Sequence, residues 1–244
     1  MSKTNGLMSP SVLVTMMYEC EAKGLAEWNE EYTMEATPSM RLGSFVDALS
    51  QGDKVYRAHL MAHPEICKKG GELRSEYVKA YEDWQDVSQR DPIYMSYLQG
   101  DAQTHLVGEI DGIPFHGYTD FMTDDFITDL KYTRNIQPEW NGTSWARSRH
   151  HDIRMAIYHE LAMQMDGKDR KCYLAALTKE SPYDHDILEV TPYTLSEAMD
   201  EVHKYIPRLK AILSGEIQPD RCGHCEYCRA TKLVTVPRDS EATE

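Results

Sequence analysis

The chain has 244 residues, of which 41% are hydrophobic and 27% charged, a composition typical of a globular protein rather than a disordered or fibrous one. Its formal net charge of −14 excludes a protein that coats nucleic acid through an overall basic surface. The first residues contain no apolar signal core, and no stretch reaches the roughly 18 apolar residues of a membrane span. We therefore expect a cytoplasmic location and no membrane contact.

The first predicted element is a helix. Ser9 followed by Pro10 is a typical helix start, and apolar residues then recur at helical spacing. This pattern predicts one helix over about 10–28, with Cys20 on its apolar side.

Further helices are expected before residue 100. A second helix should begin near Thr37 and stop at Gly52. Residues 71–100 predict two helices that separate before Pro92, because proline disfavours helix at the residue that precedes it. Residues 53–70 give no clear pattern.

The apolar period then changes to that of strands. Three strand-like runs, QTHLVGEI, IPFHGYTDFM and FITDLKYT, are separated by Asp111-Gly112 and by Thr123-Asp124-Asp125. We expect them to form a three-stranded antiparallel meander.

The last third returns to mixed patterning. Helical spacing covers 144–166, and KCYLAALTK and DILEVTP predict two more strands. Thr194 and Glu197 form a capping box for a long helix that should run to about Leu213.

The second and third strand-like runs place two acids face to face. If Asp124 and Asp125 form a two-residue turn, Asp120 lies opposite Asp129, with Cβ atoms about 4.5–5.5 Å apart. Lys131 shares the face of Asp129 by strand alternation. Two carboxylates at such a short distance need a cation or a proton between them. A pair of acids beside a lysine is suited to Mg²⁺-assisted phosphodiester hydrolysis. The alternative is a surface hairpin with solvated charges.

The same residues resemble the core of the PD-(D/E)XK nuclease superfamily, through GYTD at 117–120 and FITDLK at 126–131. LMSPSVLVTMMYECEAK resembles the opening helix of RecB-type nucleases. The likeness is greatest to phage recombination exonucleases of the exonuclease VIII (RecE) type, which degrade duplex DNA ends beside a strand-annealing protein.

The resemblance implies an α/β fold with a restriction-endonuclease-like core: a central mixed β-sheet, with a three-stranded antiparallel meander, flanked by helices. We expect a single nuclease domain over residues 1–244. It would consist of a helical N-terminal part (1–102), a catalytic sheet and helix core (103–190), and a C-terminal helix with a cysteine-rich tail (191–244).

The resemblance also implies roles for residues. Asp120 and Asp129 would be ligands of Mg²⁺ or Mn²⁺, and Lys131 the catalytic lysine. RLGSFVDAL resembles the G-x-x-x-H helix of the family with Asp47 in the histidine position, which makes Asp47 a third metal ligand. Glu109 is a weaker ligand candidate that also suits a solvated position.

A helix bearing Q-x-x-x-Y in the family resembles HHDIRMAIYHEL, with Arg154 in place of glutamine and Tyr158 retained. Arg154 would clamp a phosphate or lie on the helix surface as an ordinary charge. Tyr158 would contact DNA or only pack. We count both among the candidate catalytic residues.

The run RCGHCEYC places three thiols at the spacing of a ferredoxin motif, and the resemblance implies that Cys20 is the fourth ligand of a [4Fe-4S] cluster. Zn²⁺ bound with Cys20 or His224 is an alternative, and a tail without metal is another. In a reducing compartment the thiols are not expected to form disulfides. The candidate ligands are Cys20, Cys222, Cys225 and Cys228.

Local basic residues are expected to hold DNA despite the net negative charge. Arg134, Arg147 and Arg149 are the candidate DNA-binding residues, and Trp140 and Trp145 would stack on bases or pack in the core.

The leading hypothesis is a metal-dependent DNA exonuclease that acts on duplex ends in phage-type recombination. Its partners would be DNA and a single-strand annealing protein, with a homo-oligomer as a further possibility. Two alternatives stay open: a CRISPR-adaptation-type iron-sulfur nuclease, and an inactive nuclease fold that only binds DNA.

Overall fold

The computed structural model describes residues 6–234, so residues 1–5 and 235–244 of the expected 1–244 domain lie outside it. Its sheet has five strands that lie side by side in chain order: β1 (Asp101–Ile110), β2 (Ile113–Met122), β3 (Phe126–Thr133), β4 (Lys171–Thr178) and β5 (His185–Val190). Neighbouring strands are antiparallel except β3 and β4, which are parallel. The predicted meander and the mixed sheet of an α/β fold are therefore confirmed.

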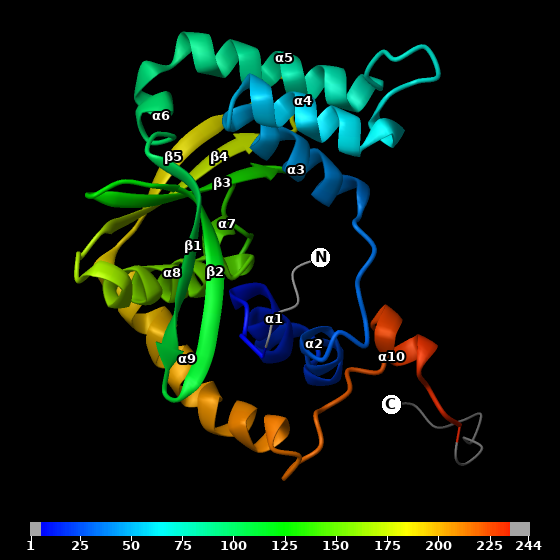
Figure 1. Cartoon of the computed structure of the whole chain (residues 1–244), viewed down its shortest axis with the longest axis vertical. Helices are drawn as coiled ribbons and strands as arrows, with labels where there is room; N and C mark the ends of the chain where they lie inside the picture. The colour runs from blue at the N-terminus through cyan, green and yellow to red at the C-terminus, as the bar shows by residue number, and fades with distance from the viewer. Residues whose placement is uncertain (1–5, 235–244) are drawn as a thin grey trace.

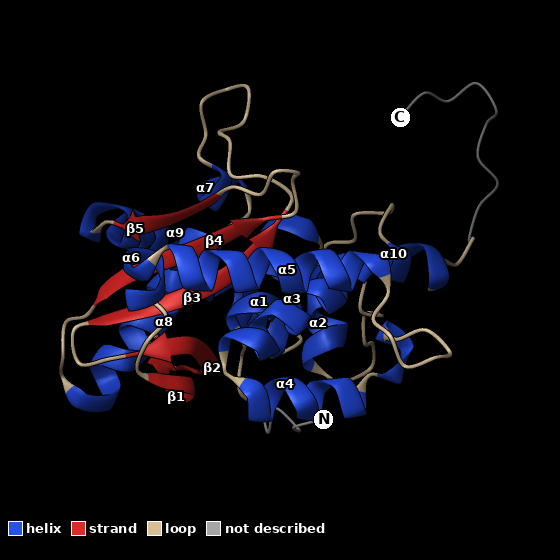
Figure 2. Cartoon of the chain, turned by 90° about the horizontal axis from the view of Figure 1, so that it is seen from above, coloured by secondary structure: helices blue, strands red, loops and turns tan. Residues whose placement is uncertain are grey.

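Helices cover both faces of this sheet (Figures 1 and 2). No helix of the described residues is both long and apolar enough to cross a membrane. The helical elements are α1 (Pro10–Val14), the π-helix η1 (Thr15–Glu19), α2 (Glu21–Trp28), α3 (Pro38–Ser50), α4 (Asp53–Ala62), the 3₁₀-helix η2 (Pro64–Ile66), α5 (Ser75–Arg90), α6 (Pro92–Ser96), α7 (Trp145–Ser148), α8 (His151–Asp166), α9 (Pro192–Leu213) and α10 (Glu226–Ala230).

The turn between β1 and β2 follows from its sequence. Asp111 and Gly112 have φ angles of 47° and 78°. Positive φ at both central residues is the requirement of a type I′ turn, which Asp-Gly meets at little cost. The turn sets the register in which β1 and β2 pair along their whole length.

Two hydrophobic cores lie on the two sides of the sheet. One packs α1, α8 and α9 against the strands, around residues such as Phe115 and Met155. The other packs α3, α5 and α6, around Phe45. Strand β3 serves both cores, with Ile127 in the first and Leu130 in the second. Burial on both faces fixes the register of β3, because a slip of one residue would exchange the two faces.

The first predicted helix is wrong in one respect, because the structure breaks it. After α1 the chain widens into η1 and then becomes extended at Cys20, where φ is −166° and ψ is 113°. The Cys20 N–H donates to the Thr15 carbonyl at 2.8 Å, five residues back. No proline or glycine marks this break, so apolar spacing alone could not reveal it.

Two other helix boundaries differ from the prediction. The expected helix over 144–166 divides into α7 and α8 at His150, whose φ of 54° is left-handed. The last helix starts earlier than predicted, since Thr191 is the N-cap and its hydroxyl accepts from the Thr194 N–H at 3.2 Å. Pro192 follows at the first helical position, where its missing N–H costs nothing.

Candidate active site

Asp120 is held where β2 and β3 separate. Phe121 pairs with Thr128 and Met122 with Ile127, which is the predicted register. At the next position a side-chain hydrogen bond takes the place of backbone pairing between the strands, because the Leu130 N–H donates to Asp120 Oδ2 at 2.7 Å. Gln103 Nε2, on β1, donates to Asp120 Oδ1 at 3.1 Å. Both oxygens are thus oriented, and each keeps a lone pair for a cation.

Asp129 forms an ion pair with Lys131, in which the aspartate is buried and the lysine half-buried. Lys131 Nζ lies 2.5 Å from Asp129 Oδ2, and Asp129 is only 5% exposed. The two residues are two apart in β3 and share a face. Burial works against ionisation of Asp129, but the charge of Lys131 outweighs it and lowers the Asp129 pKa. The same attraction raises the Lys131 pKa against the effect of burial.

Asp47 reaches the same place from α3. Together with Asp120 and Lys131 it lines a cavity of about 410 Å³ between α3 and β3. Its Oδ1 is buried and has no hydrogen-bond partner among the described residues. An orphaned buried carboxylate oxygen is costly unless a proton or a cation meets it.

The charges of this cluster are unbalanced. Burial, followed by the charge of Asp129, raises the pKa of Asp120 to about 8. Burial also raises the pKa of Asp47. Three carboxylates face one ammonium, so a cation that binds between them relieves both the repulsion and the lost hydration. Hard carboxylate oxygens are the ligands that Mg²⁺ and Mn²⁺ prefer, and the donor set fits such an ion.

Helix α8 adds Tyr158 and Arg154 to this site. The Tyr158 ring lies against β2 because residue 117 is glycine: a Cβ there would be 2.5 Å from Tyr158 Cε1. Burial, followed by the charges of Asp129 and Asp120, raises the Tyr158 pKa. Arg154 Nη1 donates to the Arg149 carbonyl at 3.0 Å, so part of its guanidinium is engaged by its own helix start.

His151 also belongs to the site, although the sequence predicted no role for it within the run HHDIRMAIYHEL. Its Nδ1 is buried without a hydrogen-bond partner among the described residues. Burial, and then the charge of Lys131, lowers its pKa to about 3, so it is neutral. The pair His150-His151 at a helix start was the one available signal, and it did not tell which histidine turns inward.

Only some arginines of the expected basic patch are free of ion pairs with acidic side chains among the described residues. Arg147 lies 3.0 Å from Glu197 and 3.6 Å from Asp152. Arg134 and Arg149 are exposed and form no ion pair within residues 6–234. The phosphate-binding role predicted for this patch therefore applies best to Arg134 and Arg149.

The structure also distinguishes between the alternative positions expected for the two tryptophans and for Glu109. Trp145 is 3% exposed and belongs to the first core, whereas Trp140 is 97% exposed. The core alternative therefore holds for Trp145. Glu109 is exposed on β1 beyond the acidic cluster, and Gln164 receives its N–H and donates to its carbonyl. Of its two alternatives, the solvated position agrees with this placement.

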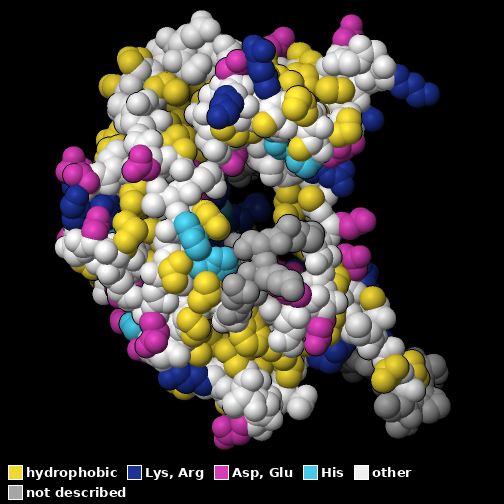
Figure 3. Space-filling view, in the orientation of Figure 1, with side chains coloured by type: hydrophobic (Ala, Val, Ile, Leu, Met, Phe, Trp, Pro, Cys, Tyr) yellow, Lys and Arg dark blue, Asp and Glu magenta, His cyan; other side chains and the backbone are white. Residues whose placement is uncertain are grey.

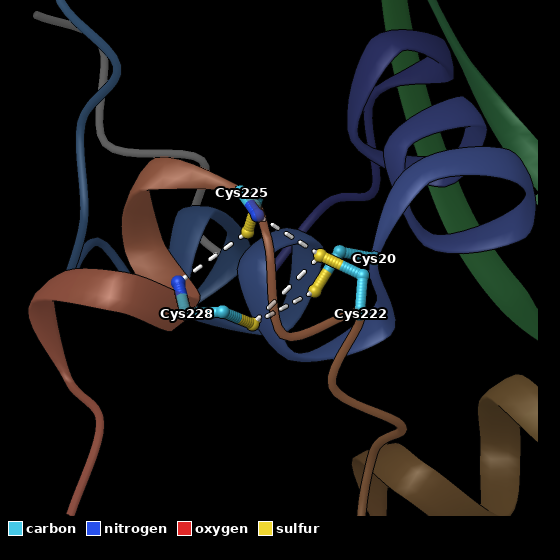
Figure 4. A group of neighbouring side chains, drawn as sticks. All are labelled: Cys20, Cys222, Cys225 and Cys228. Carbon is cyan, nitrogen blue, oxygen red and sulfur yellow. Dashed lines mark hydrogen bonds between the residues drawn. The ribbon is translucent and has the colours of Figure 1, made fainter. Parts of the chain in front are cut away.

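A second cluster brings the four predicted cysteines together (Figure 4). Their sulfur atoms all lie within 4.8 Å of one another. Cys20 comes from the break before α2, and its Sγ lies 3.5 Å from that of Cys228. The other cysteines of the chain, Cys67 and Cys172, are free and lie outside the cluster.

The spacing of these sulfurs fits one metal ion. Zn–S bonds of about 2.3 Å at tetrahedral angles place thiolates about 3.8 Å apart. The thiolates of a [4Fe-4S] cluster bind four different irons and must stand wider. Burial opposes ionisation of Cys222, but the Cys225 N–H, 3.3 Å away, helps to lower its pKa to about 6. A thiolate is the form that a metal binds.

Glu21 fastens the tail to the body beside this cluster. Its carboxylate accepts from Arg208 Nε at 2.5 Å, from Arg208 Nη2 at 2.7 Å and from the Asp220 N–H at 2.7 Å. Tyr205 donates to it as well, at 3.0 Å. Burial opposes its ionisation, yet the Arg208 hydrogen bonds lead the contacts that lower the Glu21 pKa. Helix α2, helix α9 and the tail thus meet at one carboxylate.

Comparison with known proteins agrees with this geometry. The chain is similar to a candidate exonuclease from Eubacterium rectale, whose crystal structure matches with a TM-score of 0.90 and 28% identity over 97% of this chain and 92% of that one. The structure of SSO0001 covers 85% of this chain at 13% identity, but its TM-score of 0.33 supports no inference. A search of curated proteins found no match.

Residues 9–231 match the family model described as a PDDEXK-like domain of unknown function (DUF3799). That range contains the acidic cluster, its lysine and all four clustered cysteines. The chain therefore belongs to this PDDEXK-like family and has the fold of PD-(D/E)XK nucleases.

Proposed function

We propose that the protein is a metal-dependent deoxyribonuclease that hydrolyses phosphodiester bonds from DNA ends. The observation that carries this proposal is the convergence of Asp120, Asp129 and Lys131, with Asp47, on one buried and partly uncompensated site. A structural hairpin with solvated charges would not bury these groups together.

The residues divide the chemistry between them. Asp47, Asp120 and Asp129 would hold Mg²⁺ or Mn²⁺, which supplies an activated water and neutralises charge on the phosphate. Lys131, half-buried beside Asp129 and charged, stabilises the negative charge that develops on the phosphoryl oxygens. Gln103 and the Leu130 N–H keep Asp120 oriented throughout. Arg154 and Tyr158 position the scissile strand from the side of α8.

Action on ends, in phage-type recombination beside an annealing protein, rests on the resemblance to exonuclease VIII-type enzymes and on the description of the similar E. rectale protein. We also propose that residues 1–244 act as one domain, since both cores share strand β3. A homo-oligomer is compatible with this function.

For the cysteines we propose one structural Zn²⁺ rather than a [4Fe-4S] cluster. The four sulfurs lie close enough for a single tetrahedral ion, and Cys20 joins the body to the tail. Iron with sulfide in the purified protein would overturn this assignment and would favour the adaptation-type nuclease.

End-labelled duplex DNA incubated with Mg²⁺, with Mn²⁺ or with a chelator tests the main proposal. The protein should release mononucleotides from ends only with a divalent ion, and Lys131→Ala should be inactive. Lys171→Ala, which removes an exposed lysine at the start of β4, is the matched control. Internal cuts would point to the adaptation role. DNA binding without hydrolysis under any metal would support the inactive module and reject the enzyme.

A further inference from the structure

An aromatic platform continues from the catalytic strand towards solvent. Strand alternation puts His116, Tyr118 and Asp120 on one face of β2. His105, on β1, pairs with Tyr118, and the two rings stack with centroids 4.5 Å apart and an interplanar angle of 15°. The platform therefore begins two residues from Asp120, a rise of roughly 7 Å along the backbone of β2.

The rings of the platform are exposed to solvent and contact one another. Tyr118 is 43% exposed, and His105 is exposed beside it. His116 lies edge-on to both rings, with interplanar angles of 84° and 82°, and supports them from the side. Neither the His105 nor the Tyr118 side chain has a hydrogen-bond partner among the described residues, so their polar atoms are not engaged by the rest of the protein. Figure 3 shows histidine side chains gathered over β1 and β2 at the edge of the central hollow.

We propose that His105 and Tyr118 stack on unpaired bases of the DNA strand whose phosphate enters the Asp120–Asp129 site. This inference rests on the proposed nuclease function and adds the form of its substrate. A base can lie on an exposed ring only when its own face is free. The strand is therefore single-stranded where it crosses the hairpin, as an overhang or a frayed end.

Stacking is the mode of recognition that suits this surface. The paired rings offer flat aromatic faces, and stacking on such faces tolerates any sequence. It also needs little basic surface, which agrees with a chain of net charge −14. A phosphate site is usually built from lysine or arginine cations or from backbone N–H donors directed at the ligand, and the platform of His105, His116 and Tyr118 contains no lysine or arginine.

Binding of a duplex with a short overhang that carries 2-aminopurine tests the platform. Measurements use a Lys131→Ala background with Mg²⁺, so that the DNA stays intact, and both overhang polarities. Tyr118→Ala should weaken binding about tenfold, the effect of losing one stacked base, and should remove the quenching of 2-aminopurine. Tyr118→Phe keeps the ring and should bind like the parent. Unfolding temperatures identify any variant that fails to fold.

A second measurement needs no variant on the platform. An abasic residue at the stacked position should weaken binding by the parent protein about tenfold. The same abasic DNA should bind Tyr118→Ala no more weakly than normal DNA does, because the contact is already absent.

The platform and the nuclease function fail in different ways. Equal binding of normal and abasic overhangs by the parent, or of parent and Tyr118→Ala, would overturn the platform alone. A protein with an intact Lys131 that neither binds nor hydrolyses any DNA would overturn the nuclease function, and the platform with it.

Discussion

Asp120 illustrates how a neighbouring side chain orients a carboxylate that we propose to be catalytic. Strand pairing predicts Asp120 beside Asp129, but it does not predict that Gln103 will hold one of its oxygens. Gln103 has a left-handed φ of 53°, an uncommon conformation for a residue with a Cβ. The side chain reaches Asp120 from this conformation, which local sequence patterns do not encode.

Removing this support should weaken the metal site. We expect Gln103→Ala to reduce Mn²⁺ affinity about 10- to 100-fold, the usual effect of losing a partner of a metal ligand. Titration calorimetry with Mn²⁺ measures this directly. Thr104→Ala, a change at the next residue that does not touch Asp120, should bind Mn²⁺ normally; equal affinity in both variants would remove Gln103 from the site.

At the scale of elements, the acidic hairpin was predictable because turn residues and strand alternation set its register. The break at Cys20 was not, since the sequence around it keeps helical spacing. The resemblance to nucleases suggested the partner of the tail cysteines, and the contact between Cys20 and Cys228 agrees with it. Thr191 was missed as a cap because Thr194 and Glu197, which start three residues later, match the sequence pattern of a capping box but lie inside α9.

Loss of the cysteine cluster should free the tail but leave the sheet folded. Cys228→Ser should lose bound zinc and increase hydrogen exchange over residues 216–231. We expect its unfolding midpoint to fall by roughly 4–8 °C, which corresponds to about 2 kcal/mol in a chain of this size. Cys67→Ser, outside the cluster, should keep the zinc; metal analysis and exchange measurements on both variants would detect the reverse pattern.

The end of α8 is fastened by a second carboxylate. Asp166 accepts from Arg170 Nη1 and Nη2 at 2.8 and 2.5 Å, and Arg170 Nε donates to the Thr123 carbonyl at 2.7 Å. The Arg170 hydrogen bonds are the main cause that lowers the Asp166 pKa to about 2. Helix α8 is thereby tied to the turn that precedes β3.

The ion pair between Asp166 and Arg170 should make the free energy of unfolding depend on pH in the acidic range. The folded pKa lies below the usual value of about 3.9, so the stabilisation is complete above that value and is lost as the pH falls towards 2. Asp166→Asn should therefore be less stable than the parent at pH 7, with a difference that shrinks between pH 4 and pH 2.5. Urea unfolding across this range measures the difference, and a constant gap would contradict the assignment.

At the scale of the whole molecule, an acidic protein must hold DNA through a few free cations. Arg134 and Arg149 are exposed and unpaired within the described residues, whereas Arg147 already faces Glu197 and Asp152. Sequence composition located this basic segment, but it could not show which arginines pair with acids from α8 and α9. Glu197 lies 50 positions from Arg147 in the chain, so the two meet only in the folded protein.

The salt dependence of DNA binding should distinguish the contributions of Arg134 and Arg149 from that of Arg147. Replacing both Arg134 and Arg149 by alanine should weaken duplex binding and reduce the slope of log K against log salt by about 2, or about 1 per phosphate contact. Arg147→Ala should change the slope little. Anisotropy titrations at several salt concentrations measure the slopes, and a larger effect from Arg147 would reverse the assignment.

The contacts of Cys20 and Glu21 with the C-terminal tail have a consequence for the synthesis of the protein. Cys20 and Glu21 are translated about 200 positions before the partners that they contact. During synthesis, the Cys20 thiol and the Glu21 carboxylate therefore lack these contacts until the chain has been translated through residue 228. A messenger cut short before that codon would yield a chain in which α1 can still pack in the first core but the Cys20 thiol has no Cys228 to contact.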